Sequence, residues 1–192
     1  MKALSIRGIL FISLFFVCSP ALFSQSNPRL IVRSDDMGAF HSVNMACIKA
    51  YKNGIQTVVE VMPVTAWFPE AVRLLNENPG IDVGIHLAIT SEWENVKWRP
   101  LTHSPSLTDE NGYFYPMMSP HNAYQGKSIR ENNWDITEIE REFRAQIELT
   151  LRNIPQASHI TGHMGALRFD PEVNELAHKL SEEYNLTFVE SE

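Results

Sequence analysis

Short apolar runs alternate with amphipathic segments along most of the chain. Runs of strand length lie at residues 29–36, 55–62, 81–87, 158–162 and 186–190. The first is nearly continuous in apolar residues, as in a strand buried on both faces. In the third, apolar residues from Ile81 to Leu87 alternate with Asp82, Gly84 and His86, which therefore share the opposite face. The pattern predicts five strands.

Segments with helical spacing lie between these runs, at residues 42–53, 69–78, 137–154 and 171–184. Gly54 stands where a C-terminal cap belongs, and Thr137-Glu138-Ile139-Glu140 has the form of a capping box. Asp170-Pro171 combines an N-cap residue with proline in the first turn. Cys47 falls on an apolar stripe, which favours a small buried side chain over a nucleophile.

The resulting order is β-α-β-α-β, an insertion, then α-β-α-β. Such alternation predicts an α/β fold with a parallel sheet and helices outside it, and with the active site at the carboxyl ends of the strands. The insertion, at about 91–135, holds three of the four tryptophans and is expected to be ordered and to cover a site. With 192 residues, the chain is shorter than the roughly 250 of a complete α/β barrel.

The first 24 residues have the pattern of a secretory signal peptide. Lys2 and Arg7 precede the apolar run 9–17, and small residues follow before an expected cleavage near Ser24. The run is short for a membrane span, although a retained N-terminal anchor is the alternative. We therefore expect a periplasmic or extracellular protein of residues 25–192, with no membrane span after cleavage.

Charge and cysteine content narrow the partners of this domain. The net charge of −7 becomes −9 without the signal peptide, which argues against nucleic acid because phosphate binding needs a basic face. Only Cys47 remains of the two cysteines, so no intrachain disulfide is expected. The oligomeric state stays open, with a homodimer among the possibilities.

Three groups of metal-ligand type follow predicted strands. Asp35-Asp36 ends the first, His86 the third, and His163 the fourth. Adjacent carboxylates disfavour joint ionisation unless a cation neutralises one of them. Parallel topology would bring these strand ends to one rim, where a carboxylate and two imidazoles suit a divalent metal. A lone strand histidine is more often a hydrogen-bonded core residue, so each histidine alone has a structural alternative.

Four motifs in order resemble those of the YdjC-like carbohydrate deacetylases, a family that includes chitooligosaccharide and hopanoid-glycan deacetylases. They are Leu30-Ile31-Val32-Arg33-Ser34-Asp35-Asp36-Met37-Gly38 with Asn44 six residues on, Asn53-Gly54-Ile55-Gln56-Thr57, Val83-Gly84-Ile85-His86-Leu87 and Ser158-His159-Ile160-Thr161-Gly162-His163. The family's last motif usually reads Asp-Ser-His-His-His, where this chain has Thr161-Gly162-His163-Met164-Gly165. The ligand histidine is kept and its neighbours differ.

The resemblance implies a TIM-barrel-like fold, incomplete here at the C-terminus, and metal-dependent removal of N-acetyl groups from amino-sugar-containing carbohydrates. It assigns the metal ligands to Asp36, His86 and His163 and the general base to Asp35. Asn44, in the opening motif, is assigned to substrate binding. Two imidazoles favour Zn²⁺ as the ion, whereas the family resemblance permits Mg²⁺.

The remaining candidates come from residue chemistry. His159 is the local candidate for protonating the leaving amine, and Trp93 and Trp98 are candidates for stacking on sugar rings, with ordinary packing as their alternative. Two other functions stay open. The same metal site would suit hydrolysis of an ester or phosphoester, and an exported, non-catalytic glycan-binding protein or an inactive fragment would have the same fold.

Overall fold

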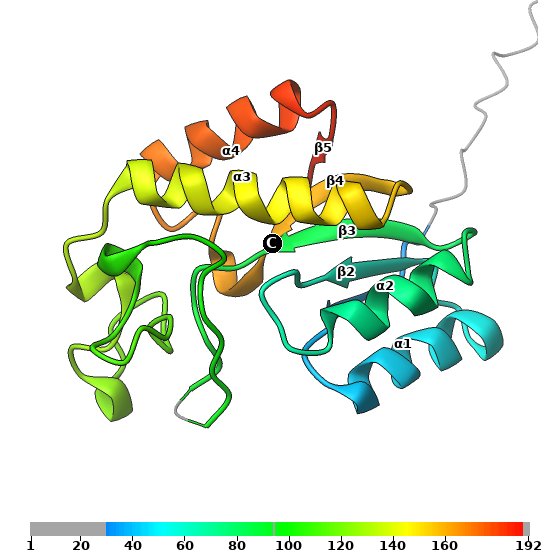
Figure 1. The fold of residues 1–192 in the computed structure, drawn as a ribbon, viewed down its shortest axis with the longest axis horizontal. Helices are drawn as coiled ribbons and strands as arrows, with labels where there is room; N and C mark the ends of the chain where they lie inside the picture. Colours follow the sequence, from blue (N-terminus) through cyan, green and yellow to red (C-terminus); the bar gives the residue numbers. More distant parts are fainter. Residues whose placement is uncertain (1–29, 94, 190–192) are drawn as a thin grey trace, which may run out of the picture. The chain divides into compact units, whose positions relative to one another are not determined.

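A five-stranded parallel sheet forms the centre of the computed structural model, which describes residues 30–93 and 95–189. The strands are β1 (Arg33–Met37), β2 (Val58–Val61), β3 (Asp82–Leu87), β4 (Ala157–Gly162) and β5 (Thr187–Phe188). They pair in the order β1-β2-β3-β4-β5, every pair parallel (Figure 1). The predicted α/β class and all five strands are confirmed. The expected signal peptide lies outside the described residues.

In the described part of the chain, four α-helices connect or flank the strands: α1 (His41–Asn53), α2 (Phe68–Asn76), α3 (Ile136–Asn153) and α4 (Pro171–Glu183). Each crossover leads to the next strand in the same direction. Because such crossovers are right-handed, the helices cover one face of the sheet. Helix α1 packs on α2, and α3 packs on α4 (Figure 1). Across residues 30–93 and 95–189, no helix is long and apolar enough to cross a membrane.

The two faces of the sheet differ in polarity. Val59, Val61, Val83, Ile85 and Ile160 are fully buried apolar residues of the central strands. The alternate positions are polar or small: Glu60 on β2, Gly84 and His86 on β3, and His159 and Thr161 on β4. Gly84 pairs with His159 and His86 with Thr161, which places these side chains on one face. The alternation predicted for residues 81–87 is confirmed.

The first strand is shorter and more open than predicted. Leu30 and Ile31 are 82% and 71% exposed, and the strand begins only at Arg33. Within β1, Asp35 is exposed and only Met37 is fully buried. The prediction of a strand buried on both faces is therefore wrong, because β1 lies at an edge of the described sheet and pairs with β2 alone.

Helix capping follows the sequence in two of three predicted cases. Gly54 is the C-cap of α1 as predicted, and its N–H donates to Ala50 O. Asp170 accepts a hydrogen bond from Glu172 N, as predicted for the start of α4. At the start of α3 the cap is Asp135, whose carboxylate accepts from the backbone N–H and the hydroxyl of Thr137. The predicted capping box at Thr137 is therefore wrong, since an acid two residues earlier captures the free N–H groups.

Buried contacts hold the segment 91–135 against the rest of the domain, including helix α3. It contains three short 3₁₀ helices, η2 (Pro105–Leu107), η3 (Asn122–Tyr124) and η4 (Ile129–Glu131). Glu142 of α3 is fully buried and accepts hydrogen bonds from the backbone N–H groups of Leu101 and Thr102. Phe114 is completely buried. The hydrogen bonds of Glu142 and apolar packing thus hold this segment beside the strand ends.

Candidate metal centre

A bulge near the end of β1 presents the first acidic ligand. The pairing of β1 with β2 shifts between Ser34 and Met37, so Asp35 and Asp36 lie in a bulge. Asp36 has a φ of 62°, a left-handed conformation that aspartate tolerates better than most residues. Asn44 of α1 holds the turn by accepting a hydrogen bond from Gly38 N at 2.7 Å. The bulge and the turn thus give Asp36 a backbone conformation that differs from that of a regular strand.

Asp36, His86 and His163 come together at the carboxyl ends of β1, β3 and β4. Each offers one ligand atom, and these atoms lie within 4.8 Å of one another. Asp36 Oδ1 is 3.1 Å from His163 Nδ1 and 3.4 Å from His86 Nε2. The histidine side chains are 3% and 5% exposed, and that of Asp36 is 40% exposed. The three predicted ligands therefore form one cluster with an opening at the carboxylate.

The adjacent acids have different partners. Asp35 is 47% exposed and pairs with Arg33 Nε at 3.1 Å, whereas Asp36 faces the two histidines. Arg33 is thus the positively charged partner of Asp35, whereas His86 and His163 are the neighbours of Asp36. The bulge separates them, so the two acids have distinct surroundings.

Charges in the metal-free cluster are strongly coupled. Burial alone would raise the pKa of Asp36, but the hydrogen bond with His163 and the charge of that ring hold the pKa well below its usual range. Burial alone would lower the pKa of His163, yet the neighbouring carboxylates of Asp36 and Glu92 raise it to about 9. His163 Nε2 lies 3.1 Å from Glu92 Oε1 without hydrogen-bond alignment, so among the described residues this buried nitrogen has no hydrogen-bond partner.

The cluster fits a divalent cation. Two ligand atoms, each about 2.1 Å from a tetrahedral ion, lie roughly 3.4 Å apart. The separations of 3.1 and 3.4 Å around Asp36 Oδ1 match that spacing. Two imidazoles and one carboxylate are a donor set used for Zn²⁺ and other first-row ions with open positions. Asp36, His86 and His163 are therefore the residues that would hold such an ion.

A cavity of about 490 Å³ opens beside Asp36. Its walls are mainly apolar and aromatic, with contributions from Phe40, Val43, Trp93, Trp98 and Met164, and its second carboxylate is Glu92. Trp98 is 7% exposed and donates Nε1–H to Thr90 O at 2.7 Å, whereas Trp93 is 56% exposed and has a φ of 52°. Trp93 and Trp98, predicted from the sequence, thus line the same cavity as a predicted ligand.

Asn44 is not among the described residues that line this cavity. Its side chain is fully buried and bonds to Gly38 N, Trp67 O and Glu70 Oε2, so its polar atoms stabilise the turn after β1. The predicted substrate contact of Asn44 stays a prediction.

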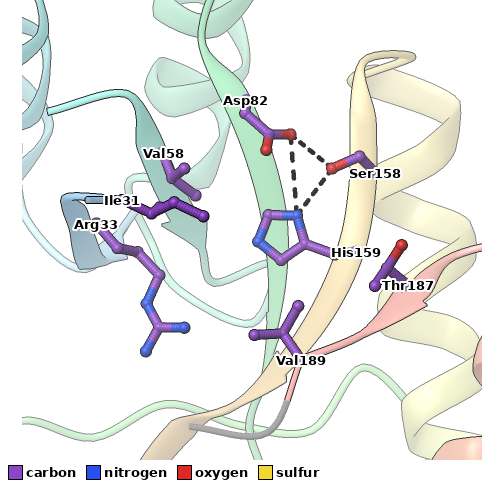
Figure 2. A pocket seen from close by; sticks show the side chains of 8 residues that line it. All are labelled: Ile31, Arg33, Val58, Asp82, Ser158, His159, Thr187 and Val189. Atoms are coloured by element: carbon purple, nitrogen blue, oxygen red, sulfur yellow. Dashed lines mark hydrogen bonds and ion pairs between the residues drawn. The ribbon is translucent and has the colours of Figure 1, made fainter. Parts of the chain in front are cut away.

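His159 lies on the polar face of the sheet, nearer to the start of β4 than the metal cluster. Its Nε2 is 2.9 Å from Glu60 Oε1. Its Nδ1 is 2.8 Å from Ser158 Oγ, which donates to Asp82 Oδ1 at 2.5 Å (Figure 2). These residues lie where the strands begin, and His159, Ser158 and Asp82 line a separate cavity of about 190 Å³. The predicted acid role of His159 stays a prediction.

Three residues near the cluster were not identified from the sequence: Glu60, Thr161 and Glu92. Glu60 is fully buried although it is charged, and a glutamate within Val-Val-Glu-Val was a detectable signal. Thr161 occupies the position where the family motif has an acid, and its hydroxyl contacts Glu60 at 2.6 Å. Glu92 follows β3 in the irregular segment, and sequence spacing gives no indication that it approaches His163.

Comparison with known proteins points in one direction. A family model described as YdjC-like protein matches residues 29–192. A carbohydrate deacetylase of Thermus thermophilus is 34% identical over 157 residues, which are 82% of this chain and 51% of that protein. Carbohydrate deacetylase 1 of Listeria innocua is 29% identical over 160 residues, covering 83% and 59% of the two chains.

A solved structure shares the fold. A protein of Enterococcus faecalis, named provisionally for cellobiose-phosphate cleavage, superposes with a TM-score of 0.72 at 26% identity. The match covers 85% of this chain and 59% of that one. The chain thus spans between half and three fifths of the length of these relatives.

Proposed function

The chain belongs to the YdjC-like family, and we propose that its Asp36–His86–His163 centre takes part in metal-dependent removal of N-acetyl groups from carbohydrates. The observation that carries this proposal is the ligand cluster at the mouth of an aromatic cavity. Curated relatives that bear the name carbohydrate deacetylase support the choice of substrate class.

The metal ligands and the aromatic residues of the cavity have different roles in the proposed reaction. A divalent ion at the three ligands would supply Lewis-acid polarisation of the amide carbonyl and acidification of a water molecule. The two buried imidazoles favour Zn²⁺ over Mg²⁺. Trp93 and Trp98 offer aromatic surfaces against which a sugar ring would pack, beside the reacting amide.

Two carboxylates compete for the role of proton acceptor. Asp35, the base implied by the family motif, is adjacent to Asp36 but is paired with Arg33. Glu92 lines the cavity and approaches His163. A general base must reach the proton that it removes. We propose Asp35 as the proton acceptor, and we expect the Asp35→Asn variant to bind metal but to have no turnover. Full turnover in that variant with loss in Glu92→Gln would move the role to Glu92.

The leaving amine requires a proton donor, which we assign to His159. Both of its ring nitrogens are engaged, by Glu60 and Ser158, so the assignment requires proton movement through that network. His159→Gln should then slow release of the amine while substrate binding persists. An unchanged rate constant in this variant would remove His159 from the chemistry.

Acetate release tests the proposed function directly. The full chain is incubated with N-acetylated oligosaccharides, with and without a chelator, and free acetate is measured. We expect acetate only when metal is present, and none from His86→Ala. Phosphate or alcohol release from esters in place of acetate would favour the other hydrolase. Stoichiometric glycan binding with no bound metal and no product would favour the non-catalytic protein.

The strand order supports a barrel. Sequential parallel neighbours from β1 to β5 follow the order of an α/β barrel, whereas a doubly wound sheet reverses its order at a switch point. We propose that this sheet is part of such a barrel. We also propose that residues 1–24 direct export, which fractionation of cells that express the full chain would test.

A further inference from the structure

A row of hydrogen bonds leads from the metal centre across the polar face of the sheet. His86 Nδ1 lies 2.8 Å from Thr161 Oγ1, and Thr161 Oγ1 lies 2.6 Å from Glu60 Oε2. Glu60 Oε1 in turn lies 2.9 Å from His159 Nε2. All four residues are at most 6% exposed, so water does not compete for these contacts. The row therefore links a proposed ligand to a buried charge.

The direction of each hydrogen bond follows from the groups involved. An ionised carboxylate only accepts, so the single hydroxyl hydrogen of Thr161 goes to Glu60. The Thr161 oxygen can then only accept from His86, which places a hydrogen on Nδ1 of that ring. A neutral imidazole has one such hydrogen, so Nε2 retains its lone pair. It is Nε2 that faces Asp36 Oδ1, at 3.4 Å.

The charge of Glu60 is maintained in its buried position. Burial alone would raise the pKa of Glu60, but hydrogen bonds from His159 and Thr161 hold that pKa below its ordinary value. Arg33 Nε, 3.7 Å from Glu60 Oε1, adds a positive charge on the other side. Glu60 is therefore an acceptor near neutral pH.

Gly84 makes room for this row. It lies on β3, between Glu60 on β2 and the two partners of Glu60 on β4. A Cβ at position 84 would overlap the Glu60 carboxylate and lie 2.5 Å from His159 Nε2. The absence of a side chain thus allows Glu60 to reach across a whole strand.

We propose that Glu60, acting through Thr161, is a positioning residue that fixes His86 in the Nδ1–H tautomer and so presents Nε2 to a divalent cation. Groups behind a ligating histidine commonly set its tautomer in this way. The metal half of this inference rests on the proposed function. The tautomer is a property of the metal-free chain and does not depend on any activity.

The test is ¹⁵N NMR of the full chain with labelled histidine, without metal, at about pH 8.5, where an ordinary imidazole is neutral. The His86 signals are assigned by their loss in His86→Gln. We expect Nδ1–H in the natural chain and in Thr161→Ser, which keeps the hydroxyl. Thr161→Val removes the acceptor and should shift His86 to a mixture or to Nε2–H. Persistence of pure Nδ1–H in Thr161→Val would overturn the proposal.

Metal affinity is the second readout. Calorimetric titration with Zn²⁺ should show about 10- to 100-fold weaker binding in Thr161→Val, with recovery in Thr161→Ser. Equal affinity in both variants would overturn the link to the metal. If Thr161→Val does not fold, Glu60→Gln provides the test, because an amide can also donate to Thr161 and the tautomer should become mixed. Absence of acetate release with these results intact would contradict the deacetylase function alone.

Discussion

The polar face of the sheet has similar residues at its two ends, but their side chains differ in how fully they are hydrogen bonded. Where the strands begin, Asp82, Ser158 and His159 bond to one another, and His159 also bonds to Glu60. Where the strands end, His163 Nε2 has no hydrogen-bond partner among the described residues, and Asp36 faces two imidazoles. An acid and a histidine are present at both ends. Among the described residues, only the end where the strands finish brings an acid and two histidines close enough to hold a metal ion.

The sharpest contrast between the two ends is expected in metal binding. His163→Ala should weaken Zn²⁺ binding by more than about 100-fold, because it removes a direct ligand from a three-residue centre. His121 is exposed and caps the start of η3, so His121→Ala is the matched control and should bind normally. Calorimetric titration gives both values. Normal binding in His163→Ala would refute the assigned centre.

The opposite end should respond in stability. His159→Ala removes the partner of the fully buried Glu60 carboxylate and should lower the free energy of unfolding by about 3 kcal/mol. His159→Gln, whose amide can still donate to Glu60, should recover part of that loss. Urea denaturation followed by circular dichroism measures the effect. A loss confined to metal affinity would mean that the two ends do not differ in this way.

The pH dependence of stability probes the metal centre without its ion. The pKa of His163 is raised to about 9 from the ordinary 6.5, so the charged form stabilises the metal-free fold. This contribution is fully present below about pH 6.5 and is lost as the pH rises through 9. Its size is on the order of 2 kcal/mol after allowance for the partial exposure of Asp36.

Denaturation of the metal-free chain between pH 6 and 10 would show this loss. His163→Gln is the control and should lack it. Added Zn²⁺ should reverse the trend, because the ion binds the unprotonated imidazole and gains affinity as the pH rises. A metal-free stability that increased over this range would contradict the assigned charge of His163.

The smallest effect on stability is expected at Asp35. Its ion pair with Arg33 is exposed, so Asp35→Asn should change the free energy of unfolding by less than about 1 kcal/mol. Asp36→Asn should cost more in the metal-free chain, because Asp36 faces His163 and His86. Parallel urea titrations compare the two variants. Equal losses of stability in the two variants would contradict the different surroundings assigned to Asp35 and Asp36.

Much of the fold was predictable because it depends on local patterns. The helical spacing of residues 42–53 and the alternation of residues 81–87 gave α1 and β3 to within one residue. The capping error at Thr137 was also local, since the true cap, Asp135, lies only two residues earlier. The error in β1 was not local: exposure of Leu30 and Ile31 depends on what packs beside an edge strand.

By itself, the sequence determined the order of strands and helices and the three residues at the strand ends that form the proposed centre. Parallel pairing brings the strand ends that carry Asp35-Asp36, His86 and His163 together, and the family resemblance selected Asp36 from the acidic pair. Only the tertiary structure decided that Asp35 turns to Arg33, that Glu92 approaches His163, and that Glu60 reaches Thr161 across Gly84. The physical reason is range: periodicity is set along one segment, whereas side-chain contacts across strands depend on register, bulges and the space left by a missing Cβ.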